Sequence, residues 1–156
     1  MEPINALPYT ALSRSEEETE ALGAAFAGFL RGRGEAFSFV ALEGDLGAGK
    51  TAFVRGVASV LAPGARVQSP TFALLREYHG ERILYHFDLY RIANEDDLAT
   101  TGYFEIGEGV ILAEWSELIP SALPPRRYIV RLERTAGGET ERLITIKETD
   151  DDHPGT

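Results

Sequence analysis

The segment that most constrains this chain is a glycine-rich octapeptide, Gly44 to Thr51, which reads Gly-Asp-Leu-Gly-Ala-Gly-Lys-Thr. It fits the pattern G-x-x-x-x-G-K-[ST] at all four fixed positions. An apolar run at residues 37–42 precedes it, and apolar residues at helical spacing follow it through residues 51–61. A strand, a glycine-rich loop and a helix in this order direct backbone N–H groups and a helix dipole at phosphate oxygens. The sequence therefore predicts a nucleotide phosphate-binding loop (P-loop) in an α/β fold.

The last two residues of the motif have separate roles in such a loop. The ammonium of Lys50 is expected to neutralise the β- and γ-phosphates, and the hydroxyl of Thr51 to bind Mg²⁺. The chain holds only one other lysine, Lys147, so few residues can supply an ammonium. The alternative is a glycine-rich turn that binds nothing.

Two acidic residues follow predicted strands and are candidates for the chemistry. Residues 110–114 read Val-Ile-Leu-Ala-Glu, and a P-loop needs such an acid after a buried strand to hold the Mg²⁺ shell. Glu114 is therefore the candidate Walker B residue, unless it merely begins the next turn. Asp88 shares a strand face with His86 and Tyr90, and it is placed to hold a metal-bound water or orient the attacking water. The alternative for Asp88 is a purely structural role, as a hydrogen-bonded residue at the edge of a strand. A zinc site is not supported, because no cysteine or further histidine completes the ligands.

A third candidate is the tetrapeptide Ser69-Pro-Thr-Phe, which lies between the P-loop helix and the next predicted strand. P-loop proteins commonly place a nucleotide switch here, and the hydroxyl of Thr71 could sense the γ-phosphate. The alternative is an ordinary Ser-Pro turn.

The rest of the chain completes a mixed α/β pattern. A capping box at Ser15 predicts a helix that ends at residues 32–34, and Asn94 caps a second helix over residues 94–98. Two hairpins are predicted, one from residues 72–78 and 82–87, the other from residues 128–132 and 143–146. We therefore expect one domain over residues 1–147, with parallel strands around the nucleotide, antiparallel hairpins and flanking helices. Residues 148–156 are expected to form an acidic, disordered tail.

Composition excludes several other classes of protein. The 156 residues include no cysteine, so disulfides and thiolate metal sites are impossible, as suits a reducing cytosol. A net charge of −10 disfavours direct RNA or DNA binding, because the field of the protein would repel phosphates. No apolar stretch is long enough to span a membrane and the N-terminus does not read as a signal peptide, so we expect a soluble, cytoplasmic protein.

Four motifs in one order carry a resemblance to a known family. The octapeptide at 44–51, Ser-Pro-Thr-Phe at 69–72, His-Phe-Asp-Leu-Tyr-Arg at 86–91 and Ala-Glu-Trp at 113–115 together resemble the TsaE (YjeE) family of bacterial ATPases. The resemblance spans about residues 15–146. Its members take part in making the threonylcarbamoyladenosine modification of tRNA.

The resemblance implies a set of site residues. ATP or ADP would contact Glu16, Gly44, Leu46, Gly47, Ala48, Gly49, Lys50, Thr51 and Trp115. Mg²⁺ would be held by Thr51 and Glu114, and the catalytic residues would be Lys50, Thr71 and Asp88, of which Asp88 is the essential acid. It also implies that the protein joins the threonylcarbamoyl transferase pair TsaD and TsaB and meets tRNA only through them. A docking protein of this kind needs no basic RNA-binding face, and we expect a monomer when it is free.

Three rival functions use the same loop. A GTP switch needs the guanine-reading Asn-Lys-x-Asp, and neither lysine follows an asparagine. A small-molecule kinase needs an acceptor pocket and a lid with several arginines, for which Arg126 and Arg127 are the only suggestion. A nucleotide-binding interaction module without hydrolysis is harder to exclude. A weak ATPase that reaches full activity in its complex lies between that module and an enzyme, and we favour it.

Overall fold

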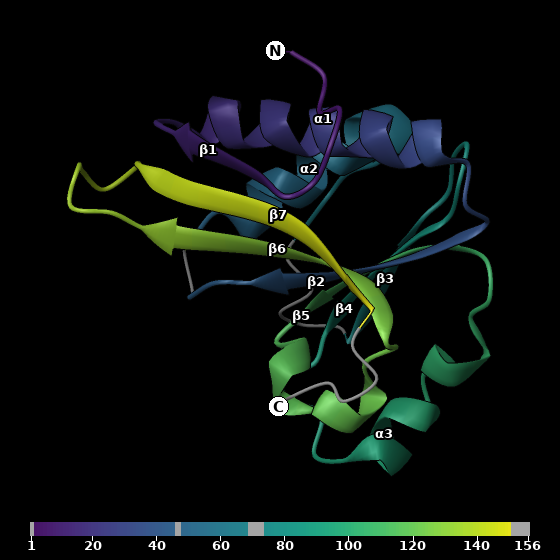
Figure 1. Cartoon of the computed structure of the whole chain (residues 1–156). Coiled ribbons are helices and arrows are strands. Elements are labelled where there is room, and N and C mark those ends of the chain that lie inside the picture. The colour runs from purple at the N-terminus through teal and green to yellow at the C-terminus, as the bar shows by residue number, and fades with distance from the viewer. Residues whose placement is uncertain (1, 46–47, 69–73, 151–156) are drawn as a thin grey trace.

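The computed structural model describes residues 2–45, 48–68 and 74–150. A single seven-stranded sheet runs through the molecule in the order β1-β7-β6-β2-β5-β4-β3. Its strands are β1 (Tyr9–Ser13), β2 (Phe37–Glu43), β3 (Leu75–Tyr78), β4 (Leu84–Asp88), β5 (Gly109–Glu114), β6 (Arg126–Arg134) and β7 (Arg142–Asp150). Helices α1 (Glu16–Arg33) and α2 (Lys50–Leu61) cover one face, and the shorter α3 (Glu95–Ala99) lies on the other side (Figure 1).

The central strands of the sheet pair in parallel, and the outer strands pair antiparallel. Strand β2 pairs in parallel with both β5 and β6, and β4 pairs in parallel with β5. Both predicted hairpins are present, as the antiparallel pairs β3–β4 and β6–β7. The structure thus confirms the expected P-loop NTPase-like α/β fold with antiparallel additions. Because β2, β4 and β5 run the same way, their carboxyl ends meet at one edge of the sheet.

Helix α1 begins and ends where the sequence predicts. The Ser15 hydroxyl accepts a hydrogen bond from the Glu18 N–H at 3.0 Å, and the Glu18 carboxylate accepts one from the Arg14 N–H at 3.2 Å. This reciprocal pair satisfies N–H groups at the helix start. Gly34 ends the helix in the left-handed conformation and donates its N–H to Leu30 and Arg31.

Helices α1 and α2 approach each other through glycines. A Cβ atom at Gly56 of α2 would collide with the Glu20 carbonyl oxygen of α1, and one at Gly23 would collide with the Phe53 carbonyl oxygen. The two backbones can therefore touch only because neither position carries a side chain. This contact places α2, the helix that follows the P-loop, against α1.

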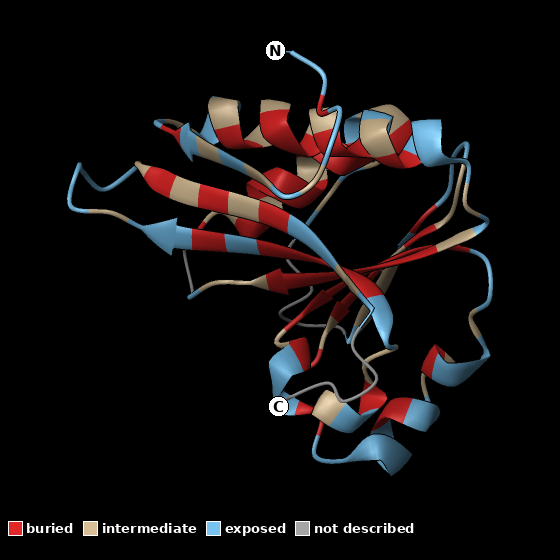
Figure 2. Cartoon of the chain, in the orientation of Figure 1, coloured by how far each residue is buried: buried red, intermediate tan, exposed pale blue. Residues whose placement is uncertain are grey.

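Apolar side chains fill the space on both faces of the sheet, and buried residues alternate with partly buried ones along the first half of β7 (Figure 2). On the helical face, Phe26, Leu30 and Phe53 are fully buried against β2, β5 and β6. On the opposite face, α3 and three short 3-10 turns, Tyr103–Glu105, Ser116–Leu118 and Pro120–Ala122, cover a second core around Phe87 and Ile111. Strand β5 is buried along its whole length, as its continuous apolar run indicates.

The structure differs from the sequence prediction at the two ends of the chain. Strand β1 was not predicted, and it exists because residues 9–13 pair with β7 along their whole length. Strand β7 continues through residues 148–150, where the acidic sequence predicts a disordered tail. The tail was predicted too long, because these residues pair with residues 126–128 of β6 and the Glu148 carboxylate forms an ion pair with Arg33 at 2.9 Å.

Within the described part of the chain, no helix combines the length and apolar character needed to cross a membrane.

Candidate functional site

The candidate site lies at the edge where β2, β4 and β5 end. Residues 44–49 connect the end of β2 to α2, and Gly49 caps the helix with a φ of 104°, a conformation that favours glycine. Lys50 and Thr51 are the first two residues of α2. The loop motif therefore stands at a helix N-terminus, where free N–H groups and the helix dipole attract anions.

The Lys50 ammonium is buried at the centre of this site. Only 5% of the Lys50 surface is exposed, and its Nζ donates a hydrogen bond to the Gly44 carbonyl oxygen at 2.6 Å. Nζ also lies 3.7 Å from Glu114 Oε1 and 4.4 Å from the centroid of the Trp115 ring. A buried ammonium needs such partners, because an isolated charge in a protein interior is costly. The cation is therefore held between the P-loop and the end of β5.

Glu114 is held from its other side by a histidine. His86 of β4 is fully buried, and its Nε2 lies 2.6 Å from Glu114 Oε2. A carboxylate only accepts hydrogen bonds, so the Nε2–H is the donor. His86 Nδ1 has no hydrogen-bond partner among the described residues. Glu114 thus uses one oxygen toward His86 and turns the other toward Lys50.

Asp88 lies beside Glu114. The two residues are register partners on β4 and β5, and the Asp88 side chain accepts a hydrogen bond from the Tyr90 N–H at 3.0 Å. Asp88 is only half-buried, so it borders the site where solvent can reach it. A carboxylate next to Glu114 and at the open edge of the site can act on a water molecule.

An aromatic pair forms the rim of the site. Trp115 follows β5 in a left-handed conformation with a φ of 62°, which is uncommon for a residue other than glycine. Its ring lies 5.2 Å from the ring of Tyr90, which is 62% exposed. The turn at Trp115 thus places the indole against the Lys50 ammonium, with the exposed ring of Tyr90 beside it.

Glu16 lies at the start of α1, whose first turn is next to the P-loop. A Cβ atom added at Gly49 would come within 3.7 Å of the Thr19 side chain of α1. The Glu16 side chain itself is 70% exposed, and its Oε1 lies 3.8 Å from Arg55 Nη1. The structure thus brings the helix of Glu16 to the loop, with this carboxylate paired to α2.

Of the predicted site residues, the structure gathers Gly44, Ala48, Gly49, Lys50, Thr51, Asp88, Glu114 and Trp115 at this edge, with Glu16 on the adjacent helix. Leu46, Gly47 and Thr71 lie outside the described residues.

Comparisons with known proteins identify the family to which this chain belongs. A family model described as "Threonylcarbamoyl adenosine biosynthesis protein TsaE" matches residues 13–144. The chain belongs to the TsaE family. A TsaE protein of Bacillus subtilis is 44% identical over 132 residues, which cover 83% of this chain and 79% of that protein. One from Treponema pallidum is 40% identical over 137 residues, which cover 86% of this chain and 97% of that protein.

The fold is also that of a solved structure. The crystal structure of Bacillus subtilis YdiB superposes with a TM-score of 0.71 at 33% sequence identity. The superposition covers 95% of this chain and 90% of YdiB. The chain therefore carries a TsaE-type fold over nearly all of its length.

Sequence reasoning did not predict two features of this region. The pairing of His86 with Glu114 joins neighbouring parallel strands, and only the shared strand face of His86 and Asp88 pointed toward it. Glu117 follows Trp115, and partial desolvation raises the pKa of its carboxyl, while the charge of Glu43 acts in the same direction. Nothing in the sequence near Glu117 indicated that it faces the end of β2.

The donor groups suit Mg²⁺ bound together with a nucleotide. The described residues contain no group of three or more His, Cys, Asp or Glu side chains that could hold a metal ion by themselves. Mg²⁺ usually takes one or two protein oxygens and completes its shell with phosphates and water. The carboxylate of Glu114 and the hydroxyl of Thr51 are oxygen donors of the kind that such a partial set requires.

Proposed function

We propose that this protein binds ATP with Mg²⁺, hydrolyses it slowly, and supports the threonylcarbamoyl transferase pair TsaD and TsaB in forming threonylcarbamoyladenosine on tRNA. The observation that carries the proposal is the buried Lys50 ammonium at the N-terminus of α2, held between the Gly44 carbonyl and Glu114. A triphosphate is the ligand class that matches a buried ammonium beside free helix N–H groups.

Each group around the site has a role in this proposal. Lys50 would contact the β- and γ-phosphates, and Thr51 and Glu114 would hold Mg²⁺, which neutralises charge on the phosphates when bound. His86 would keep the Glu114 carboxylate in one orientation, as partners of metal ligands commonly do. Asp88, at the open edge, would orient the attacking water.

The partner part of the proposal rests on the family and on the charge of the chain. The relatives named above are tRNA threonylcarbamoyladenosine biosynthesis proteins. A net charge of −10 is unfavourable for direct binding of tRNA, because the protein and the phosphate backbone are both negatively charged. A protein that assists the tRNA-binding transferase by docking on it needs no basic surface.

The kinase alternative gains no support from the placement of its arginines. Arg126 and Arg127 begin β6, which runs parallel to β2, so they lie at the end of the sheet away from the P-loop. Arg126 pairs with Glu35, and Arg127 donates to the carbonyl oxygens of Pro124 and Pro125. Arginines that are bonded at that end of the sheet cannot form a lid over phosphates bound at the P-loop.

The binding part is tested by Lys50→Ala, with ATP affinity measured by equilibrium dialysis. Affinity should fall by at least about tenfold, because a hydrogen bond to a charged group contributes roughly 1.5–3 kcal/mol. Lys147→Ala is the matched control, since it removes the only other lysine, which is exposed on β7. Equal affinity in the parent and Lys50→Ala, with native circular dichroism, would show that the P-loop assignment is wrong.

The enzymatic part is tested by ATP hydrolysis measured alone and then with TsaD and TsaB added. We expect slow turnover alone and stimulation by the pair. Binding without turnover in either condition would indicate a nucleotide-binding interaction module. Turnover that the pair leaves unchanged would contradict the proposed partnership.

A further inference from the structure

Arg142 is a buried arginine that touches the P-loop from the far end of the sequence. It is the first residue of β7, and only 8% of its surface is exposed. Its Nε donates a hydrogen bond to the Ala48 carbonyl oxygen at 3.1 Å. Its Nη1 donates to the carbonyl oxygens of Glu139 at 2.5 Å and Glu141 at 2.9 Å. One guanidinium therefore holds both the P-loop backbone and the turn between β6 and β7.

The bond to Ala48 sets the direction of the next N–H group. The peptide between Ala48 and Gly49 is planar, and in its trans form the carbonyl and the N–H point to opposite sides. When Arg142 holds the carbonyl at β7, the Gly49 N–H is turned away from β7. Gly49 immediately precedes Lys50, so this N–H belongs to the loop that would present donors to phosphate.

The charge of Arg142 argues for more than closure of a turn. A buried guanidinium is costly, and a hairpin turn can be closed by backbone hydrogen bonds alone. Here Nη1 serves the turn of its own hairpin, whereas Nε reaches a residue 94 positions earlier in the chain. A rigid, planar group with donors in fixed directions can hold both at once, which a lysine cannot.

We propose that Arg142 is a positioning residue for phosphate binding, which keeps the Ala48–Gly49 peptide oriented for a nucleotide. The proposal rests on the proposed binding of ATP. Arg142 also links the turn at residues 135–141 to the P-loop, and the Thr140 hydroxyl of that turn bonds the Arg14 carbonyl oxygen just before α1. A molecule that binds to this turn and shifts it would therefore also shift the P-loop backbone, because Arg142 is bonded to both.

The test uses Arg142→Met, which keeps a long side chain but has no donor, and Arg142→Lys, which keeps the charge. ATP affinity, measured by equilibrium dialysis, should fall by about tenfold in Arg142→Met and by less in Arg142→Lys. The KM for ATP should rise more than kcat falls, because the residue orients a binding loop and does not touch the reacting atoms. If Arg142→Met does not fold, the ATP affinity of Arg142→Lys is compared with that of the parent.

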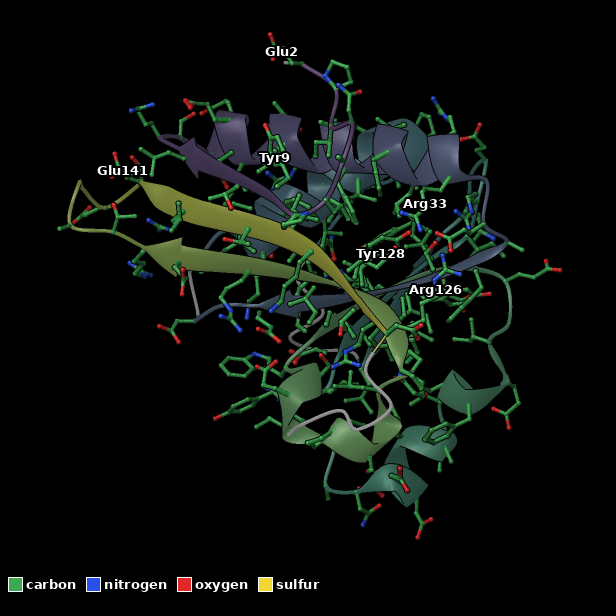
Figure 3. All side chains as sticks on the ribbon, in the orientation of Figure 1. Glu2, Tyr9, Arg33, Arg126, Tyr128 and Glu141 are labelled. Carbon is green, nitrogen blue, oxygen red and sulfur yellow. The ribbon has the colours of Figure 1, made fainter. Side chains whose placement is uncertain are left out.

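The matched control is Arg126→Met. Arg126 belongs to the same hairpin and also holds an ion pair, but it stands at the opposite end from the turn, which Glu141 marks in Figure 3. Its substitution should leave ATP affinity unchanged. Parental affinity in both folded Arg142 variants would overturn the proposal.

A second measurement is independent of nucleotide binding. Hydrogen–deuterium exchange without ATP should be faster in Arg142→Met than in Arg126→Met for peptides covering residues 44–50, because the loop has lost its anchor. Unchanged exchange there would also overturn the proposal. If the parent chain fails to bind ATP, the proposed function fails, and the exchange comparison still decides whether Arg142 holds the loop.

Discussion

At the scale of single residues, the candidate site is a short chain of buried polar groups. His86 holds one oxygen of Glu114, the other faces the Lys50 ammonium, and Lys50 bonds the Gly44 carbonyl oxygen. Removing one member of a buried ion pair leaves the other without compensation, which costs about 3–5 kcal/mol. Substitutions of the acidic residues at this site therefore keep the size of the side chain that they replace.

Glu114→Gln meets this condition. The amide keeps the shape and an acceptor oxygen but loses the charge that would hold Mg²⁺ and attract Lys50. We expect Mg²⁺-dependent hydrolysis to fall far more than nucleotide binding measured in EDTA. Equal losses in the two assays, together with a lower unfolding midpoint, would indicate that Glu114 serves the fold instead.

Asp88→Asn tests the half-buried acid beside Glu114. The substitution keeps the acceptor for the Tyr90 N–H and removes the charge. Turnover at saturating ATP should fall while ATP affinity stays near that of the parent, the pattern of a group needed mainly in the transition state. Unchanged turnover would show that Asp88 has only a structural role at the end of its strand. The hydrogen bond from the Tyr90 N–H is compatible with that role.

At the scale of elements, the position of α2 depends on its close crossing with α1. The carbonyl oxygen of Glu20 occupies the space where a side chain at Gly56 would begin, and that of Phe53 does the same for Gly23. The start of α2 carries Lys50 and Thr51, so this crossing also sets where the two residues that we propose to bind ATP and Mg²⁺ stand relative to β5.

Gly56→Ala should therefore be destabilising, although alanine favours a helix more than glycine does. A Cβ there must push the two helices apart. Such overpacking should lower the free energy of unfolding, measured with urea, by about 1–3 kcal/mol. Gly28→Ala in α1 is the control, because a Cβ at Gly28 meets nothing within 4 Å among the described residues. It should stabilise the protein by about 0.5–1 kcal/mol. Similar effects of the two substitutions would contradict the crossing.

At the scale of the whole molecule, the strand order assembles the site from distant segments. Placing β5 between β2 and β4 brings residues 86–88 and residue 114 beside the loop that follows residue 43. The two cores, one under α1 and α2 and one under α3, hold this sheet from both faces. A ligand that bridges the loop and the strand ends should therefore stabilise the entire fold.

Mg·ATP should raise the thermal unfolding midpoint of the protein. At a concentration of about 100 times the Kd, binding to the folded state alone contributes roughly 2.7 kcal/mol, which corresponds to a rise of several degrees. Differential scanning calorimetry measures it. The rise should be clearly smaller in Lys50→Ala and unchanged in Lys147→Ala, and a rise as large in Lys50→Ala as in the parent would place the ATP elsewhere.

Features that depend only on neighbouring residues could be predicted from the sequence alone. The P-loop between an apolar strand and a helix, the caps of α1 and α3 at Ser15 and Asn94, and both hairpins follow from local hydrogen bonding and hydrophobic spacing. The resemblance of four motifs to one family also needed only their order along the chain.

Which of these elements come into contact depends on the packing of the whole chain. Strand β1 has no strong pattern of its own and forms because β7 offers an edge, whereas β7 runs to Asp150 because its last three residues pair with β6. The bonds from His86 to Glu114 and from Arg142 to Ala48 join residues 28 and 94 positions apart. Strand order and sheet register set such contacts, and both are non-local because they arise from packing the whole sheet.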